Sequence, residues 1–280
     1  MLRQRVITAL LLGALFLSGL FLLSPHVFAI SVGLVVVYAA WEWSDMAGLP
    51  GWFWRAVYTL LMLVALIVVA GLTGFSIQTG LNTAVVKSFL LTGCLWWLIA
   101  FFLVRGYPGN ELLWGSCWVR SIMGALVLLP TWVAVVALIH LPNGSWLLLM
   151  AILIVVFADV GAYFSGRKFG RHKLAPGVSP GKTWEGFVGG LMANVGLAAV
   201  LGILLPLSVR DGAWLLVVIV VTSCASVLGD LLESMVKRHR GIKDSGNILP
   251  GHGGVLDRVD SVTAALPVFS LFLLVTGLSF

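Results

Sequence analysis

Acidic and basic side chains gather in one segment near the carboxyl end of this 280-residue chain. Residues 236–261 lie between two long apolar runs and hold five Lys or Arg residues together with Asp244, Asp257 and Asp260. Such a mixture suits a site where metal ions and cationic side chains together neutralise phosphate groups. The segment therefore predicts phosphate chemistry beside a membrane.

Two helix ends are predicted to direct carboxylates toward this segment. At the end of one apolar run, Asp230, Ser234 and Lys237 fall at i, i+4 and i+7, so a helix would place them on one face. At the start of the next run, Asp257 and Asp260 fall at i and i+3 and again share a face. The acids of both helices would then meet near the membrane boundary.

Asp230 stands close to the end of an apolar run. An ionised carboxylate inside a bilayer costs about 2.5–3.5 kcal/mol on insertion scales, so it needs a partner or a wet cavity. A divalent cation would be such a partner, and oxygen ligands favour Mg²⁺, or Mn²⁺ in its place, over zinc. The alternatives are an ion pair of Asp230 with a neighbouring helix and a solvated helix start for Asp257 and Asp260.

The loop at residues 250–254, Pro-Gly-His-Gly-Gly, is predicted to bend between the two helices. Its glycines, Gly253 and Gly254 among them, would let backbone N–H groups approach a phosphate closely. Phosphoryl transfer needs positioning and charge neutralisation more than proton transfer. We therefore interpret His252 as a binding or structural residue of the loop rather than as a general acid or base.

Ser179, Lys182 and Thr183 form a second candidate segment. Gly181-Lys182-Thr183 resembles the end of a P-loop, but that motif requires Gly where Pro176 stands and a preceding strand, so we reject an ATPase. We expect a helix to start at Ser179-Pro180, with Lys182 or Thr183 reaching a phosphate at its N-terminus. The alternative is the ordinary positive charge of a cytoplasmic loop.

The composition predicts an integral membrane protein. Hydrophobic residues make up 60% of the chain and charged residues 10%, with a mean hydropathy of +1.07, whereas about a quarter of the residues of a soluble domain are charged. No polar stretch is long enough for a separate soluble domain, and the Cys and His residues show no zinc-binding spacing. We predict an all-α, polytopic transmembrane helical bundle.

Run length indicates about nine spans, with eight to ten as the range. They are Val6–Leu23, Val27–Trp43, Val57–Leu72, Ser88–Val104, Ile122–Leu141, Trp146–Phe164, Trp184–Leu205, Trp214–Met235 and Val262–Leu278.

The basic residues predict the orientation of these spans. With the N-terminus in the cytoplasm, the inner side receives five Lys or Arg before residue 121, five in 167–182 and five in 237–258, leaving only Lys87 and Arg210 outside. An excess of positive charge on the inner side is what orients membrane proteins. The net charge of +6 therefore indicates orientation in a bilayer rather than nucleic-acid binding.

We predict one integral membrane domain, 1–280. Residues 1–145 form its amino-terminal helices, and residues 146–280 form the catalytic helices with cytoplasmic loops at 165–183 and 236–261. Trp41, Glu42 and Trp43, at the end of the second span, are expected to be interfacial anchors.

The carboxyl-terminal segment resembles the signature of the phosphatidate cytidylyltransferases, also called CDP-diacylglycerol synthases. The matching residues are Ser234, Lys237, Arg238, Lys243, Asp244, Gly246, Pro250, His252, Gly253, Gly254, Asp257, Arg258 and Asp260. A second recurring stretch of that family resembles Ser179, Pro180 and Lys182 to Gly186.

The resemblance implies a dimeric, bacterial-type inner-membrane enzyme that depends on Mg²⁺ and uses CTP and phosphatidic acid. It associates the metal centre with Asp230 and Asp257, beside Ser234 and Lys237. Asp244 and Asp260 are second choices as ligands or orienting groups, and a second, monovalent cation is left open.

The predicted reaction is an in-line attack of the phosphatidate phosphate on the α-phosphorus of CTP, which releases pyrophosphate. The predicted charge-neutralising residues are Lys182, Lys237, Arg238, Lys243 and Arg258. The alternatives are another lipid-phosphate nucleotidyltransferase on this scaffold and a multi-pass transporter. The concentration of charged residues at one membrane face disfavours the transporter.

Overall fold

The structure, a computed structural model, describes residues 2–75, 80–249 and 251–278, so Pro250 of the predicted bend lies outside the described residues. Helices dominate, and a small hairpin interrupts them between α7 and α8. The elements are α1 (Leu2–Leu22), α2 (Pro25–Met46), α3 (Gly51–Leu72), α4 (Thr83–Gly106), α5 (Glu111–Trp114), α6 (Cys117–Ile139), α7 (Gly144–Phe169), β1 (Lys173–Ala175), β2 (Ser179–Thr183), α8 (Trp184–Leu204), α9 (Val209–Arg240) and α10 (Leu256–Thr276).

Each of the nine predicted spans overlaps one long helix of the structure. Within the described residues, eight helices are long and apolar enough to cross a membrane, and α1 contributes a shorter apolar stretch, Val6–Leu22. The prediction of a polytopic helical membrane bundle is therefore confirmed. Which side of the membrane receives the N-terminus stays a prediction.

A serine and a glycine fix the ends of α9, the helix that carries Asp230. The Ser208 hydroxyl accepts a hydrogen bond from the backbone N–H of Asp211, which supplies a partner for one of the unpaired N–H groups of the first turn. At the other end, Gly241 adopts φ 77°, a left-handed conformation that ends helices and favours glycine. The helix therefore stops just after its basic last turn, and the loop toward α10 begins there.

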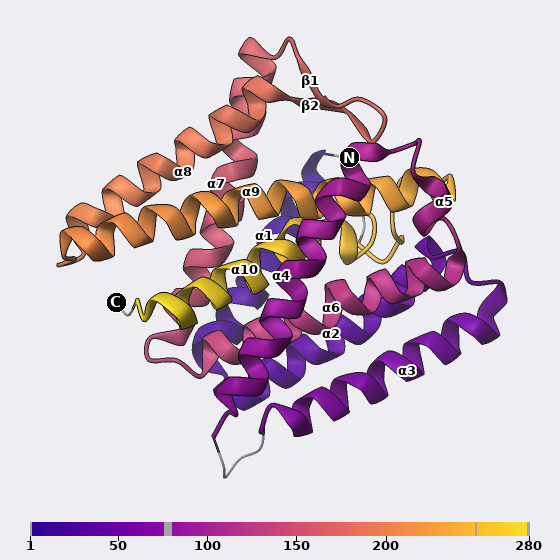
Figure 1. Cartoon of the computed structure of the whole chain (residues 1–280), viewed down its shortest axis with the longest axis horizontal. Coiled ribbons are helices and arrows are strands. Elements are labelled where there is room, and N and C mark those ends of the chain that lie inside the picture. Colours follow the sequence, from indigo (N-terminus) through magenta and orange to yellow (C-terminus); the bar gives the residue numbers. More distant parts are fainter. Residues whose placement is uncertain (1, 76–79, 250, 279–280) are drawn as a thin grey trace.

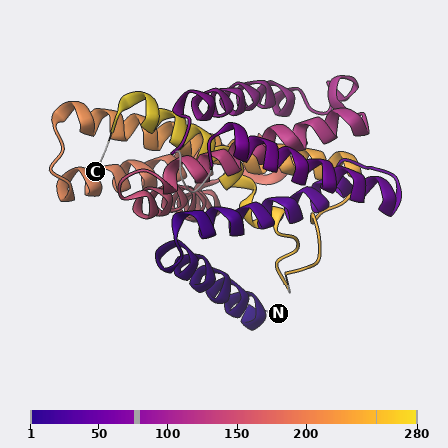
Figure 2. The same ribbon diagram turned by 90° about the horizontal axis from the view of Figure 1, so that it is seen from below.

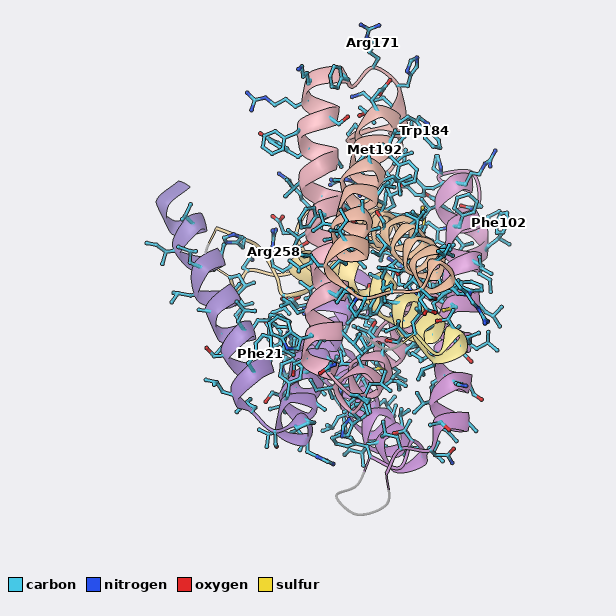
Figure 3. All side chains as sticks on the ribbon, turned by 90° about the vertical axis from the view of Figure 1, so that its left-hand side faces the viewer. Phe21, Phe102, Arg171, Trp184, Met192 and Arg258 are labelled. Atoms are coloured by element: carbon cyan, nitrogen blue, oxygen red, sulfur yellow. The ribbon has the colours of Figure 1, made fainter. Side chains whose placement is uncertain are left out.

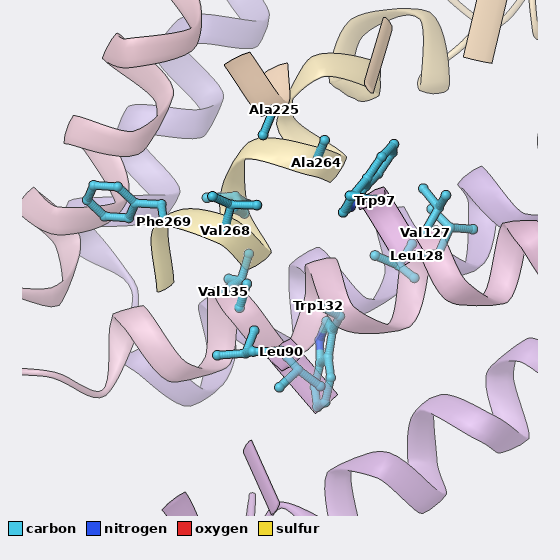
Figure 4. Packing of buried hydrophobic residues seen from close by; sticks show 14 of the residues in the cluster. Leu90, Trp97, Val127, Leu128, Trp132, Val135, Ala225, Ala264, Val268 and Phe269 are labelled. Carbon is cyan, nitrogen blue, oxygen red and sulfur yellow. The ribbon is translucent and has the colours of Figure 1, made fainter. Parts of the chain in front are cut away.

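The core lies around α6, whose side chains from Val127 to Ile139 are almost all buried. Figure 4 shows Leu128, Trp132 and Val135 of this helix near Ala264 and Val268 of α10. The Trp132 indole N–H donates to the backbone carbonyl of Ala29 in α2, at 2.9 Å. A helix that is apolar all round belongs inside a bundle, and α6 accordingly supports both α2 and α10, which carry residues of the candidate site.

The ends of the long helices separate into two groups in Figure 1. The β1–β2 hairpin and α5 lie toward the top and right of the view, whereas the α8–α9 connection and the C-terminus lie on the left. The helix ends predicted to face the cytoplasm are thus on one side of the molecule. Figure 2 shows α1 standing away from the other helices, with the α9–α10 connection on the same side.

The prediction of a helix start at Ser179-Pro180 is wrong. Ser179–Thr183 form β2, which pairs antiparallel with β1 through Lys173 and Thr183. Thr183 is extended, and its hydroxyl accepts the backbone N–H of Gly186, so α8 begins at Trp184. Because the hairpin pairing holds the backbone extended up to Thr183, the helix starts five residues later than expected.

Candidate active site

The residues singled out from the sequence form two neighbouring carboxylate–lysine clusters at the ends of α9 and α10. One contains Asp230 and Lys182, and the other contains Asp257 and Lys237. Lys182 comes from β2, so a residue 48 positions earlier in the chain reaches Asp230. The fold therefore gathers both predicted segments at one place.

Asp230 is the more open of the two acids, with 28% of its side chain exposed. The Lys182 ammonium lies 2.6 Å from its Oδ2, and the Ser234 hydroxyl donates to its Oδ1 at 3.1 Å. Asp230 and Ser234 are one helical turn apart on α9, as their spacing predicted. Each carboxylate oxygen therefore has one partner here and keeps room to accept another.

Two further acids lie beside this pair. Asp260 of α10 is within electrostatic range of Asp230 and Lys182, and Asp159 in the second half of α7 is within range of the same two groups. The Asp260 Oδ1 also accepts the backbone N–H of Ser261 at 2.7 Å. Asp260 is also within electrostatic range of Lys237, so these three carboxylates share two ammonium groups, and a bound cation would lower the repulsion among the acids.

Asp257 is enclosed, and only 5% of its side chain is exposed. Its Oδ1 accepts the Lys237 ammonium at 2.6 Å, and its Oδ2 accepts the backbone N–H groups of Ser245 and Gly254, each at 2.8 Å. Lys237 also donates to Glu233, one turn earlier on α9, at 3.0 Å. This carboxylate therefore fastens the α9–α10 loop to the end of α9.

Glu42 of α2 fastens the start of α10. It is 2% exposed, and its two oxygens accept the backbone N–H groups of Val255 and Leu256 at 3.0 and 2.8 Å. These groups open the first turn of α10, where a negative charge is favourable. A hydroxyl hydrogen bond from Ser245 at 3.2 Å completes the contact. The amino-terminal half thus fixes the start of the helix that carries Asp257.

A cavity of about 510 Å³ lies in the α9–α10 loop. Its lining contains Lys243, Asp244, His252, Gly253 and Arg258, all predicted as binding or metal-ligating residues. The buried Nδ1 of His252 has no hydrogen-bond partner among the described residues. Figure 3 shows Arg258 in the region between α1 and α7. Two cationic side chains and an unpaired ring nitrogen suit a phosphate-bearing ligand.

Other predicted residues make contacts within the chain itself. Thr183 is buried and caps α8, and the Gly254 N–H is directed at Asp257. Ser179 pairs with Ala175 in the hairpin. Arg238 is exposed and lies within electrostatic range of Tyr107. Their roles toward substrate stay predictions.

The expectation that Glu42 and Trp43 are interfacial anchors is wrong. Both are buried, and the Trp43 indole N–H donates to the backbone carbonyl of Arg120 at 2.8 Å. Glu42, Glu233 and Asp159 are the site residues that the sequence reasoning missed. All three are acids inside apolar runs, so the argument that singled out Asp230 would have found them.

The donor set fits a hard divalent cation. Among the described residues, no three His, Cys, Asp or Glu side chains already form a group able to hold a metal ion. Mg²⁺ in enzymes commonly uses only one or two protein carboxylates and completes its shell with water and substrate phosphates. Asp230, with Asp260 nearby, supplies such a partial set of oxygen ligands.

Comparison with known proteins identifies the family. Residues 3–276 match the model described as the cytidylyltransferase family. The chain belongs to this family. A relative from Pseudomonas aeruginosa, named phosphatidate cytidylyltransferase, is 44% identical over 99% of this chain and 98% of its own length. Relatives with the same name from Haemophilus influenzae and Brucella suis are 39% and 35% identical, each over 97% of this chain, and are covered over 98% and 93% of their lengths.

The resemblance first carried by the carboxyl-terminal signature is therefore confirmed over nearly the whole chain. The matches include the amino-terminal half, where the signature gave no information. This agrees with the contacts of Glu42, through which α2 holds the start of α10 in this chain.

Proposed function

We propose that this chain transfers the cytidylyl group of CTP to phosphatidic acid and so makes CDP-diacylglycerol and pyrophosphate. The observation that carries the proposal is the meeting of Lys182, Asp230 and Asp260, which come from three separate segments. Arg258, two residues before Asp260 on α10, lines the cavity that also contains Lys243. The names of the relatives that match the chain end to end support the same assignment.

The reaction needs one displacement at phosphorus. An anionic oxygen of the phosphatidate phosphate attacks the α-phosphorus of CTP, and the bond from that phosphorus to the oxygen bridging to the β-phosphate breaks. The electron pair leaves with pyrophosphate, and no covalent bond to the enzyme forms. Because phosphatidate is already an anion near neutral pH, the reaction requires positioning and charge neutralisation rather than a general base.

The cationic residues divide between two places in this proposal. Lys243, His252 and Arg258, which all line the cavity, bind the triphosphate. Lys182 lies against Asp230 and neutralises charge at the reacting phosphorus. Arg238 is exposed at the end of α9 and attracts the nucleotide from solution.

Asp230 would hold Mg²⁺, with Asp260 and Asp244 as the other proposed ligands, and the enclosed Asp257 would act as an orienting acid that fixes the loop. When bound, the metal polarises phosphate oxygens and offsets the charge of the leaving pyrophosphate. The two acids that the sequence predicted to bind the metal each pair with a lysine, Asp230 with Lys182 and Asp257 with Lys237. Lys182, whose side chain is 26% exposed, is the ammonium group that a phosphate can reach, whereas Lys237 is 9% exposed and holds Asp257 and Glu233 together.

The membrane setting follows the charge distribution. We propose a bacterial inner-membrane enzyme with its N-terminus and site on the cytoplasmic side, where fifteen of the 17 Lys and Arg residues would lie. CTP enters from the cytoplasm, and phosphatidate enters sideways from the bilayer. A homodimer is proposed from the family resemblance alone.

The test uses the full chain purified in detergent micelles. Pyrophosphate release and formation of the lipid product are measured with phosphatidate and CTP, with and without Mg²⁺. We expect product only when all three are present. ATP, GTP, UTP and dCTP in place of CTP separate this activity from that of another nucleotidyltransferase. Pyrophosphate release without phosphatidate, or product formation with ATP alone, would contradict the assignment.

A further inference from the structure

A second cavity, of about 520 Å³, lies where the ends of α2, α3, α6 and α9 meet. Its lining shares no residue with the cavity around Lys243. The residues used below are Trp41, Asp45, Trp52, Arg55, Arg120 and Arg240. None of them has a part in the proposed transfer reaction.

Two guanidinium groups of this cavity share one carboxylate. Arg55 and Arg240 both approach the Oδ1 of Asp45, at 3.7 and 3.4 Å. Those distances exceed the 2.7–2.9 Å that is typical of a tight charge-assisted hydrogen bond. Arg120 adds a third positive charge within electrostatic range of Arg240. The cavity therefore carries excess positive charge that Asp45 alone does not neutralise.

Arg120 presents a buried donor that has no partner among the described residues. The residue is 8% exposed, and its Nη1 donates to the backbone carbonyl of Met46 at 3.1 Å, but its buried Nε has no hydrogen-bond partner among the described residues. Leaving a buried polar group of a charged side chain unpaired is costly. Gly48, at φ 76°, lies so close that a Cβ there would be 3.1 Å from the Arg120 Nη2. A glycine thus leaves space beside this guanidinium.

The start of α3 points to the same ligand chemistry. Pro50 occupies the N-cap position without a side-chain hydrogen bond, and Gly51 and Trp52 of the first turn line the cavity. Unpaired N–H groups at the start of a helix of 22 residues attract anions. Arginines and a helix start together are typical of a phosphate site rather than of a carboxylate-lined cation site.

The aromatic residues indicate where the anion comes from. The Arg55 guanidinium stacks over the Trp41 ring at 4.5 Å, and Trp52 is 73% exposed at the edge of the cavity. Phe53, next along the helix, is 64% exposed. Exposed tryptophan beside arginine is characteristic of the membrane interface, at the level of the phospholipid head groups. The cavity therefore opens where lipid phosphates are concentrated.

We infer that this cavity binds the phosphate group of an anionic phospholipid, separately from the reacting substrates. Arg240 and Asp230 are ten residues apart on α9, which corresponds to about 15 Å along a helix axis. The bound phosphate would fill the space between Arg55, Arg120 and Arg240. Its ester chains would lie along the exposed aromatic residues of α3.

The experiment measures binding without CTP or Mg²⁺, so its result does not depend on the proposed reaction. Delipidated full-length protein in neutral detergent is titrated with phosphatidylglycerol, which is anionic but is not the proposed substrate. Native mass spectrometry counts bound lipid, and thermal unfolding reports stabilisation. We expect a saturable site that the Arg55→Gln/Arg240→Gln double variant binds at least tenfold more weakly.

The matched control is Arg105→Gln, which removes an exposed arginine from the last turn of α4. This variant should bind phosphatidylglycerol like the wild type. A third variant, Arg120→Met, removes the buried arginine of the cavity. If this variant does not fold, the double variant still tests the proposal, because Arg55 and Arg240 are partly exposed. Equal binding by the wild type and the double variant would overturn the proposal. The proposal would also be overturned if inorganic phosphate displaced phosphatidylglycerol at the concentration at which the lipid itself binds, because the cavity would then be a site for free phosphate rather than for lipid.

Discussion

Asp257 and Asp230 are both aspartates, and each pairs with a lysine at 2.6 Å, yet their surroundings differ. Asp257 is enclosed, and two backbone N–H groups occupy its second oxygen. Asp230 is partly open, and its other contact is one serine hydroxyl. The comparison separates an acid that holds the loop in place from an acid that a ligand can reach.

The two lysines follow the same division. The Lys237 side chain is 9% exposed and lies between Asp257 and Glu233, so losing either acid would leave a buried charge poorly compensated. The Lys182 side chain is 26% exposed and comes from the hairpin outside the bundle. Water can solvate Lys182 when it leaves Asp230. The Asp230 pair is therefore the one that can open without loss of the fold.

The largest expected effect is on stability, from Asp257→Ala. The substitution leaves Lys237 with Glu233 alone and removes the acceptor of the Ser245 and Gly254 N–H groups. Breaking a buried ion pair costs about 3–5 kcal/mol. Thermal unfolding in detergent should therefore shift to clearly lower temperature, and activity should fall with it.

Asp244→Ala is the matched control, because Asp244 is an exposed acid in the same loop. It should unfold close to the wild-type temperature. If Asp257→Ala instead unfolds like the wild type but loses turnover, Asp257 acts mainly on the ligand, and the contrast with Asp230 fails.

Asp230→Asn is expected to affect turnover while leaving stability nearly unchanged. The amide keeps the size of the side chain but loses the charge that would bind a cation. Loss of one well-placed electrostatic contact typically costs a factor of about 10²–10³ in kcat. Product formation is measured at saturating CTP and phosphatidate, and unfolding is measured on the same samples.

Asp211→Asn changes an acid in the first turn of α9, at the opposite end of the same helix, and should leave turnover intact. An Asp230→Asn enzyme that keeps more than about a tenth of wild-type activity would argue against a direct role of this carboxylate.

The spans and the α9–α10 site could be predicted because their signals are local. The length of an apolar run is set by the thickness of the bilayer. Asp230 and Ser234 are one helical turn apart, and the structure confirms that their side chains meet, because they form a hydrogen bond. The location of Lys182 in a β-hairpin rather than in a helix could not be predicted in this way. Its extended backbone depends on pairing with β1, and a Ser-Pro pair is equally compatible with a helix start.

Glu42 shows the other limit of sequence reasoning. Its position beside two tryptophans is typical of the membrane interface, but its partners are the N–H groups of residues more than 200 positions later. Only the packing of α2 and α10 against α6 brings these groups together. An unpaired acid in an apolar run indicates that a partner exists without indicating which one.

A smaller effect on stability is expected from Glu42→Gln, which loosens the start of α10 near the enclosed Asp257. The amide fits the same space but presents one acceptor oxygen instead of two, so one of the N–H groups of Val255 and Leu256 loses its partner. An unsatisfied buried donor costs about 1–3 kcal/mol. Hydrogen–deuterium exchange should become faster at the start of α10.

Glu111→Gln, in the partly exposed α5, is the control for loss of an acid elsewhere and should leave exchange at α10 unchanged. Unchanged exchange in Glu42→Gln would mean that the start of α10 does not depend on the carboxylate, and the proposed tie between the two halves of the chain would be lost.

The smallest expected effect comes from Ser234→Ala, which tests the open acid without removing it. The substitution deletes the hydroxyl hydrogen bond to the Asp230 Oδ1 and leaves the Lys182 pair in place. One such bond contributes about 0.5–1.5 kcal/mol, so turnover should fall by roughly two- to tenfold. Ser226→Ala, two turns earlier on α9, removes a buried hydroxyl that donates to a backbone carbonyl of the same helix, and should leave turnover unchanged.

If Ser234→Ala lowered turnover as far as Asp230→Asn does, the serine would itself have to contact the ligand rather than orient the acid. A rise in the Mg²⁺ concentration needed for half-maximal activity, with kcat at saturating Mg²⁺ kept, would instead support the orienting role.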